Sequence, residues 1–257
     1  MAKKKKGPFQ KFISSLVTIV CLAVFIYASS GLFNAFMDYY KNRKMMSEVQ
    51  DIYYESDSAN TAEAAESNGI RSGFDELLKQ NEDVVGWITI EDTQVDYPIL
   101  HSSDNFDYLK TNYYGEESRA GSIFMDFRND ITSSDLNTVI YGHRMKDGSM
   151  FQQLTKFLEQ DFFEEHRTFQ YDTLYESYEA EIFAVYHTLT DFNYIETDFP
   201  SDEAYEKLLN QIQEKSIFQT DIELSADDRI ITLSTCDYQL DADDGRLVVH
   251  AKLVKKS

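Results

Sequence analysis

Cysteine is scarce in this chain of 257 residues, which contains two. Cys21 lies in a long uncharged stretch near the N-terminus, so the rest of the sequence carries a single thiol, Cys236, with no partner for a disulfide. In an oxidising compartment, a lone thiol is a liability unless it is used. Cys236 also ends Ile230–Cys236, a run rich in β-branched residues, and it is therefore a candidate nucleophile.

Basic residues are scarce beyond residue 46. The whole chain carries a net charge of −21 and residues 1–46 contribute +7, which leaves −28 for residues 47–257. A region this acidic repels nucleic acid and anionic lipid surfaces, so we expect no nucleic-acid partner. Most of this negative charge is typical of side chains on a solvent-exposed protein surface.

Charged side chains are absent from residues 12–37. A helix of about 20 apolar residues crosses a bilayer core, so this stretch is long enough to span a membrane. More basic residues precede it than follow it, which favours a single-pass anchor in the cell membrane with a cytoplasmic N-terminus and an extracellular domain. A cleaved signal peptide is the alternative, because Ala28–Gly31 is a run of small residues. Apolar residues resume at Leu32, Phe33 and Phe36, which favours an uncleaved anchor.

This anchor divides the sequence into four segments. We expect a basic cytoplasmic tail at residues 1–11, a transmembrane signal-anchor at 12–37, an extracellular stalk or linker at 38–72 and a globular domain at 73–257. Within the third segment, Ser47–Ser72 is polar and acidic, which predicts a stalk or a poorly packed helix outside the core.

Short strands dominate the globular region. The pattern predicts them at Val84–Ile90, Val95–Leu100, Ser122–Met125, Asn137–Tyr141, Tyr178–Tyr186, Arg229–Cys236 and Arg246–Val254. Pro98 requires an edge position or a bulge in the second strand. Alternation in the fifth predicts a shared face for Tyr178, Ala180, Ile182, Ala184 and Tyr186.

Two amphipathic helices interrupt the strands. Ser149–Glu159 begins with a capping box formed by Ser149 and Gln152. Ser201–Lys215 begins with a cap and two acidic residues, which suit the helix dipole. Mostly short strands with a few inserted helices indicate an antiparallel-rich β-barrel with helical decorations.

A cysteine nucleophile needs a base, which is usually histidine. His143 directly follows a predicted strand and precedes a turn, so its side chain can project into a cleft. The contexts of the other histidines differ: His101 and His166 suit surface positions, and His187 and His250 suit the barrel wall.

Arg246 is the third candidate. It opens the last predicted strand ten residues after Cys236, so it lies beside Cys236 if the two strands are neighbours. A guanidinium at that point can hold an oxyanion or a substrate carbonyl through paired N–H donors. A salt bridge to Asp243 or Asp244 is the alternative.

These motifs resemble the signatures of the sortase family: Tyr141-Gly142-His143, Thr232-Leu233-Ser234-Thr235-Cys236, and Arg246 ahead of Leu247–Leu253. The resemblance covers roughly residues 74–254 and includes Val85–Ile88 and Asp96–Pro98. The Thr-Leu-Ser-Thr-Cys form and the helix at Ser201–Lys215 resemble class B sortases in particular. Each motif alone is weak, but their joint order, with an anchor and a lone exported thiol, is specific.

The resemblance implies a closed, sortase-like β-barrel of about eight strands with inserted helices, preceded by the transmembrane helix. It also implies a cysteine transpeptidase. Cys236 attacks the Thr carbonyl of a sorting signal and forms a thioester, His143 protonates the leaving amine, and an incoming amine then attacks the thioester. Arg246 steadies the substrate and the oxyanion.

The same resemblance places Tyr141 and Ser234 in the substrate groove, with Asp237 as a weaker candidate for substrate binding. The implied substrates are secreted proteins with an NPQTN-like or LPXTG-like sorting signal. The implied acceptor is an amine on a peptidoglycan precursor, which attaches surface proteins to a Gram-positive cell wall. A lysine amine on a pilin subunit is the alternative acceptor, and the residues do not separate the two.

We expect no metal or cofactor. Asp241–Gly245 matches a calcium loop poorly, because glycine falls at the fifth position and Lys252 stands where the loop needs glutamate.

Other classes fit less well. L,D-transpeptidases resemble a Ser-x-Gly-Cys pattern, whereas Thr235 precedes Cys236, and a papain-like protease needs a Cys-Trp pair that this chain lacks. The alternative outside enzymes is an acidic, membrane-anchored surface protein with a buried cysteine. Rapid alkylation of native Cys236 distinguishes a catalytic thiol from a buried one.

Overall fold

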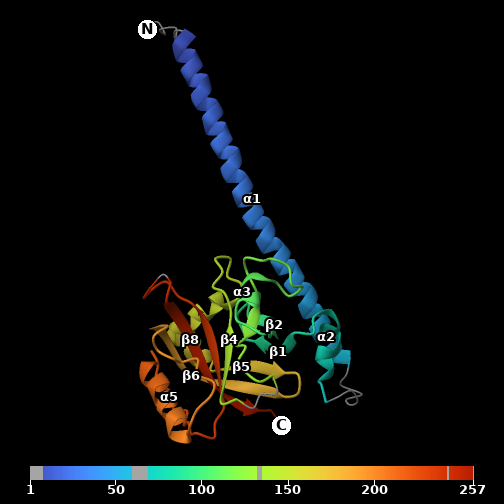
Figure 1. The fold of residues 1–257 in the computed structure, drawn as a ribbon, viewed down its shortest axis with the longest axis vertical. Helices are drawn as coiled ribbons and strands as arrows, with labels where there is room; N and C mark the ends of the chain where they lie inside the picture. Colours follow the sequence, from blue (N-terminus) through green and yellow to red (C-terminus); the bar gives the residue numbers. More distant parts are fainter. Residues whose placement is uncertain (1–7, 60–68, 132–134, 242, 257) are drawn as a thin grey trace. The chain divides into compact units, whose positions relative to one another are not determined.

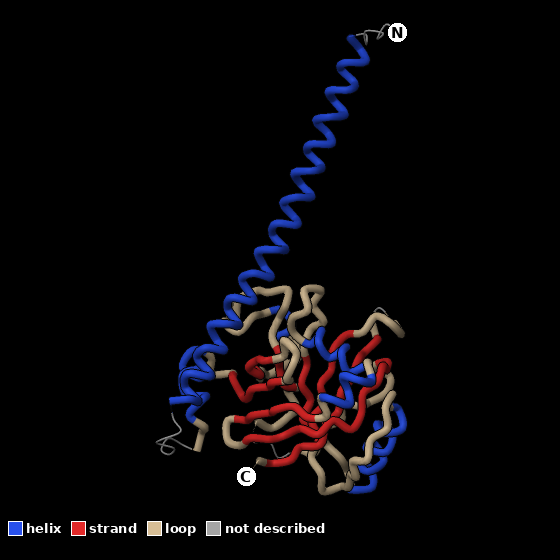
Figure 2. The backbone as a smooth tube through the Cα atoms, turned by 180° about the vertical axis from the view of Figure 1, so that it is seen from behind, coloured by secondary structure: helices blue, strands red, loops and turns tan. Residues whose placement is uncertain are grey.

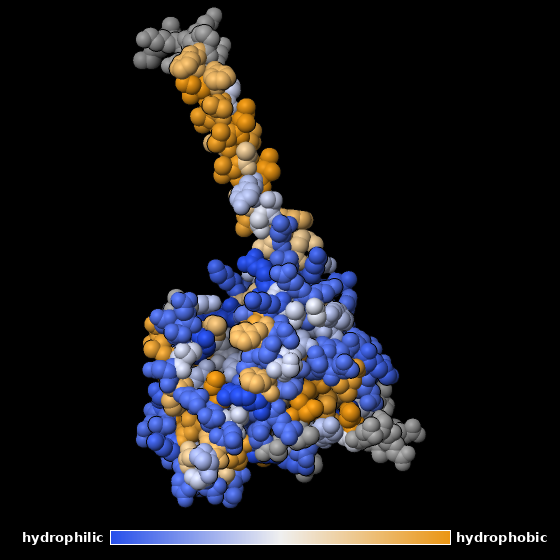
Figure 3. Space-filling view, viewed as in Figure 1, coloured by the Kyte–Doolittle hydropathy of each residue, from blue (hydrophilic) through white to orange (hydrophobic). Residues whose placement is uncertain are grey.

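A computed structural model describes residues 8–59, 69–131, 135–241 and 243–256. The chain divides into two compact units, Met1–Arg43 and Lys44–Ser257. Helix α1 (Pro8–Ala59) makes up the described part of the first unit and continues into the second. Figure 3 shows the hydrophobic side chains that cover its first part. By length and composition, this helix can cross a membrane.

The second part of α1 packs into the barrel unit. Met45, Met46, Val49 and Tyr53 are buried in the main hydrophobic cluster, because their spacing puts them on one face of the helix. The Tyr53 ring stacks on Trp87 with 4.1 Å between ring centroids. The interpretation of the polar segment as lying outside the core is therefore wrong for Val49 and Tyr53. Residues 60–68 of that segment lie outside the described residues.

A truncation series tests this packing. A chain that starts at Lys44 should keep the stability and chemistry of the barrel unit, because it keeps the buried face of α1. Each buried apolar side chain contributes about 1.5–3 kcal/mol. A chain that starts at residue 60 should therefore lose about 5 kcal/mol or more of its free energy of unfolding, measured by urea denaturation. Equal stability of the two chains would contradict the packing of α1.

Eight strands in the described residues form a closed barrel in the order β1-β2-β3-β4-β7-β8-β6-β5, which confirms the predicted fold class (Figure 1). The strands are β1 (Val84–Thr89), β2 (Asp96–Leu100), β3 (Ile123–Met125), β4 (Asn137–Tyr141), β5 (Thr168–Thr173), β6 (Ser177–Leu189), β7 (Ile230–Cys236) and β8 (Gly245–Lys255). The sequence pattern did not predict β5, which pairs with β1 and β6 and closes the barrel.

Helices shorter than α1 precede the first strand and connect later ones (Figure 2). They are η1 (Ser72–Phe74), α2 (Asp75–Gln80), α3 (Asp107–Lys110), η2 (Phe151–Leu158), α4 (Gln160–Glu165) and α5 (Asp202–Lys215). The predicted cap of α5 is confirmed, because the Ser201 side chain accepts a hydrogen bond from the Ala204 N–H. The predicted capping box at Ser149 is wrong. The Ser149 hydroxyl donates to Asp147 at 2.7 Å instead, and η2 is a 3-10 helix.

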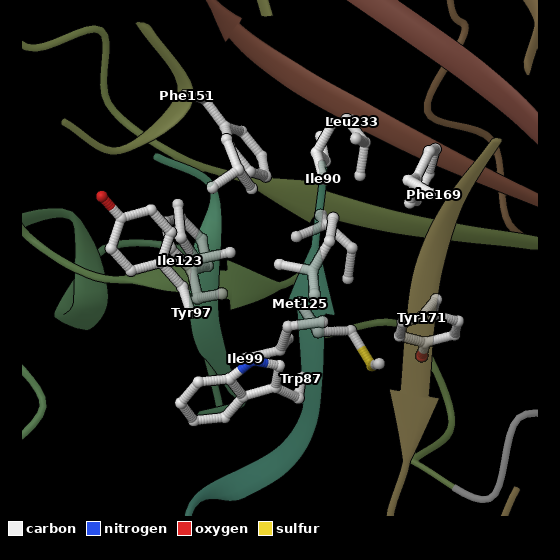
Figure 4. Packing of buried hydrophobic residues seen from close by; sticks show 14 of the residues in the cluster. Trp87, Ile90, Tyr97, Ile99, Ile123, Met125, Phe151, Phe169, Tyr171 and Leu233 are labelled. Carbon is white, nitrogen blue, oxygen red and sulfur yellow. The ribbon is translucent and has the colours of Figure 1, made fainter. Parts of the chain in front are cut away.

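The core has two parts. Figure 4 shows the main cluster, in which side chains from different strands converge, among them Ile99, Met125, Phe169 and Leu233. A second cluster lies between α5 and the strands β6, β7 and β8. Pro98 has the predicted edge position on one side of its strand. It pairs with β1, whereas the ladder between β2 and β3 begins one residue later, at Ile99.

The predicted common face of β6 is wrong beyond Ile182. Tyr178, Ala180 and Ile182 pack in the main cluster, whereas Ala184 and Tyr186 pack in the second cluster. A register shift between Ile182 and Ala184 inserts one extra residue. Because side chains alternate between the faces of a strand, one extra residue exchanges the two faces.

Candidate active site

The candidate nucleophile and base follow two strands that run side by side. Strand β4 pairs with β7 in parallel, with Tyr141 opposite Ser234. The Gly142 N–H donates to the Ser234 carbonyl at 3.2 Å, which extends the ladder beyond β4. His143 and Cys236 lie two residues past Tyr141 and Ser234, at equivalent positions. Because neighbouring strands lie about 4.8 Å apart, we expect the imidazole and the thiol to lie at neighbouring strand ends.

An ion pair joins the residues that directly follow His143 and Cys236. Arg144 follows His143, and Asp237 follows Cys236. The Arg144 Nη1 lies 2.6 Å from the Asp237 Oδ2. Since side chains alternate along an extended chain, this ion pair and the His143–Cys236 pair occupy opposite faces.

A main-chain contact fixes the tautomer of His143. Its Nε2 lies 2.7 Å from the Leu109 carbonyl oxygen, on α3. A carbonyl oxygen accepts hydrogen bonds and does not donate them, so the Nε2 carries the proton. The Nδ1 is then the nitrogen that can exchange a proton with the thiol or with a leaving amine.

Gly121 makes room for this contact. It has a φ of +57°, a conformation that favours glycine. A Cβ at this position would lie 2.6 Å from the Tyr108 carbonyl oxygen, 2.9 Å from the Leu109 carbonyl oxygen and 3.1 Å from the His143 ring. The backbone of α3 and the imidazole can therefore approach each other only around a glycine.

Gly121→Ala should impair the base without touching the thiol. The added methyl group displaces the Leu109 carbonyl and the His143 ring, and misplacement by about 1 Å costs roughly a hundredfold in rate. We expect turnover of a sorting peptide to fall by roughly that factor. The matched control is Gly115→Ala, which also has a positive φ but has open space around its Cβ. Equal losses in both variants would assign the effect to backbone strain alone.

Arg246 lies opposite Cys236 in the antiparallel β7–β8 ladder, as predicted for neighbouring strands. Its Nη1 donates to the main-chain oxygens of Asp243 at 2.9 Å and Gly245 at 2.8 Å. The guanidinium therefore binds the backbone of its own turn rather than the acidic side chains considered as its alternative partners. A Cβ on Gly245 would lie 2.0 Å from the Asp237 carbonyl oxygen, so this tight turn requires glycine.

Tyr141 and Ser234 face hydrogen-bond partners in the wall beside the site. The Tyr141 hydroxyl donates to the buried Asp126 at 2.8 Å. The Ser234 hydroxyl lies 2.8 Å from the hydroxyl of Tyr194. Burial raises the pKa of Tyr141, and the charge of Asp126 raises it further.

Tyr194 belongs to the site, although the sequence did not indicate it. Burial raises the pKa of the Tyr194 hydroxyl. The Ser234 hydrogen bond and the positive charge of Arg246 oppose this rise, and Cys236 adds to it. The hydrogen bond between the Tyr194 and Ser234 hydroxyls therefore links Tyr194 to the strand that ends at Cys236. The Tyr194 carbonyl also accepts a hydrogen bond from Asn137, at the start of β4.

The remaining histidines lie outside this group. His250 is fully buried in β8, and burial lowers its pKa to about 3. His187 lies in β6 with its Nδ1 3.4 Å from an Asp237 oxygen. Both positions confirm the expected barrel wall. His166 stacks on Phe162 and contacts Asp92, whose hydrogen bond raises the pKa of His166.

Comparisons with known proteins agree with this arrangement. The sequence matches the sortase domain family over residues 88–254. The chain is 45% identical to sortase B of Listeria monocytogenes over 249 residues, which cover 96% of this chain and 99% of that protein.

This chain belongs to the sortase family.

Solved structures support the same assignment. Sortase B from Bacillus anthracis in complex with AAEK1 has a TM-score of 0.77 at 54% identity, over 86% of this chain and 100% of that chain. A Staphylococcus aureus sortase B–substrate complex has a TM-score of 0.79 at 37% identity, over 86% of this chain and 100% of that chain. The predicted resemblance to class B sortases is therefore confirmed.

Sequence reasoning missed four parts of this sortase site: the Leu109 carbonyl, Gly121, Arg144 and Tyr194. The first two act through backbone positions, which leave no chemical signature in a sequence. Arg144 had a usable signal, because it follows His143 as Asp237 follows Cys236. That signal becomes informative only once β4 and β7 are known to pair in parallel.

Proposed function

We propose that this sortase is a membrane-anchored, extracellular cysteine transpeptidase that attaches surface proteins to peptidoglycan. The thiolate of Cys236 attacks the Thr carbonyl carbon of a sorting signal, and the C–N bond breaks to give a thioester. His143 delivers the proton to the leaving amine. An acceptor amine then attacks the thioester and loses a proton to His143, which forms a new amide, breaks the C–S bond and releases the thiolate.

The register of β4, β7 and β8 is the observation that supports these roles. In this register Tyr141 lies opposite Ser234, two residues before His143 and Cys236, and Arg246 lies opposite Cys236. A nucleophile, a proton donor and a guanidinium then surround one carbonyl group. A thiol with a nearby cation is nucleophilic near neutral pH, and a thioester keeps the acyl group activated without ATP.

The substrate and the acceptor are the finer parts of the proposal. A class B resemblance favours an NPQTN-like signal over an LPXTG-like one, and an amine on a peptidoglycan precursor over a pilin lysine. One similar solved structure is a sortase B complexed with triglycine, a short peptide with a free amine. Helix α1 supports the anchor, with the barrel unit outside the cell.

Trapping the acyl-enzyme tests the proposal directly. The chain is incubated with NPQTN- and LPXTG-containing peptides, quenched in acid and examined by intact mass spectrometry. We expect a mass increase equal to the peptide acid that ends at Thr less one water, located on Cys236 after digestion. In parallel reactions, triglycine or a lysine amine is added before the quench, to identify the acceptor that removes the label. Absence of an adduct with every peptide would refute a sortase function.

A further inference from the structure

The ion pair between Arg144 and Asp237 lies directly behind the proposed catalytic pair. Asp237 is 1% exposed, and the side chain of Arg144 is 21% exposed. Arg144 follows His143 beyond the end of β4, and Asp237 follows Cys236 directly after β7, and these two strands are parallel neighbours. The ion pair therefore links the two chain segments that carry His143 and Cys236.

The Asp237 carboxylate has several hydrogen-bonding and charged partners. Its Oδ2 accepts from Arg144 at 2.6 Å. Its Oδ1 accepts the Gln239 N–H at 2.7 Å and lies 3.4 Å from the Nδ1 of His187. The main-chain N–H of Asp237 donates to the Gly245 carbonyl oxygen at 2.9 Å. A buried carboxylate with these partners has little capacity left to bind a substrate.

Arg144, the other partner of the ion pair, makes further contacts of its own. Its Nε donates to the Gln152 side chain at 3.0 Å, on η2. Its backbone forms an isolated bridge with Met150, and its guanidinium lies 5.9 Å from the ring centroid of Tyr238. Arg144 thus ties the segment after β4 to η2 and to the turn after β7. The planar guanidinium makes these contacts in fixed directions, which an ammonium cannot reproduce.

We propose that the Arg144–Asp237 ion pair is a positioning pair that holds His143 at reacting distance from Cys236. This inference rests on the proposed function. Asp237 then acts through Arg144 and not on the substrate, in contrast to its weaker assignment from sequence. Loss of either charge leaves the other buried without its partner, and the two strand ends separate. The reacting groups lose alignment, while the surface that binds the peptide stays in place.

The test compares Arg144→Gln, Asp237→Asn and the double variant in the full-length chain. We expect kcat for a sorting peptide to fall by about 30-fold or more in each single variant, with KM within about threefold, because misalignment affects the reacting geometry. The double variant should recover most of the kcat, since Gln and Asn can hydrogen-bond to each other without leaving a charge. Arg144→Lys keeps the positive charge but loses the planar guanidinium. Its kcat should lie between those of the wild type and Arg144→Gln.

Asp172→Asn is the matched control. Asp172 is also buried and pairs with Arg71 at 2.8 Å, in a part of the barrel away from the strand ends of the site. The Asp172→Asn variant should have a lower melting temperature, as Asp237→Asn does. Its kcat should equal that of the wild type at a temperature where both variants are folded. A similar loss of kcat in Asp172→Asn would show a general effect of stability and overturn the proposal. So would a double variant that is no better than the single ones.

The outcomes also separate this proposal from the proposed function. If the wild-type chain forms no acyl-enzyme with any peptide, the sortase mechanism itself fails. If the wild type forms the acyl-enzyme and Asp237→Asn keeps its kcat, only the positioning role fails. Should Asp237→Asn not fold, the comparison of Arg144→Lys with the double variant decides the same question.

Discussion

Cys236→Ala is expected to abolish both peptide cleavage and amine transfer while the barrel stays folded. The loss should reach roughly 10⁴-fold or more, because removal of a nucleophile eliminates the covalent route. No second thiol can replace it, since Cys21 lies in the apolar part of α1. Cys236 is partly exposed at the end of β7, so its truncation should change the free energy of unfolding by less than about 1 kcal/mol.

The measurement is peptide turnover by the purified variant, together with thermal unfolding by circular dichroism. The matched control is Cys21→Ala, which should keep full turnover. The alternative of a non-catalytic surface protein with a buried cysteine makes the opposite prediction for the wild type, namely slow alkylation and no turnover. Residual turnover by Cys236→Ala above the peptide-only background would contradict a cysteine mechanism.

Much of the site was readable from the sequence because its signals are local. A lone thiol at the end of an apolar run, a histidine after a strand and an arginine at the start of the next strand identified Cys236, His143 and Arg246. Their roles remain predictions, but the structure brings His143 and Cys236 to neighbouring strand ends and Arg246 opposite Cys236. The barrel was also predictable, since short strands with β-branched residues recur along the chain.

The parts that escaped prediction depend on long-range packing. Parallel pairing of β4 with β7 joins residues almost a hundred positions apart, and no local pattern specifies it. Val49 and Tyr53 stand in an acidic segment whose average composition hides one buried face. The bulge in β6 follows from pairing with β8 rather than from the alternation in its own sequence. Each miss concerns a contact between elements, whereas composition and periodicity report on one element at a time.

Arg246→Lys should be badly impaired although it keeps the positive charge. The hydrogen bonds of the Arg246 side chain explain why the planar guanidinium, with its several N–H donors, matters. One end of the guanidinium, Nη1, already binds the main-chain oxygens of Asp243 and Gly245. We expect this anchoring to leave the other N–H groups of the same rigid plane available to the substrate. A lysine ammonium is a single point donor, so it cannot hold the turn and an oxyanion at the same time.

We expect turnover of the Arg246→Lys variant to fall on the order of a hundredfold, as for the loss of one oxyanion donor, and Arg246→Ala to be at least as poor. Iodoacetamide labelling of Cys236 should fall much less, because the substitution leaves both the thiol and His143 in place. Arg229→Lys makes the same exchange at the opposite end of β7 and should leave turnover unchanged. If Arg246→Lys turns over at nearly the wild-type rate, the guanidinium serves only the turn at Asp243 and Gly245, and the oxyanion must find its donors elsewhere.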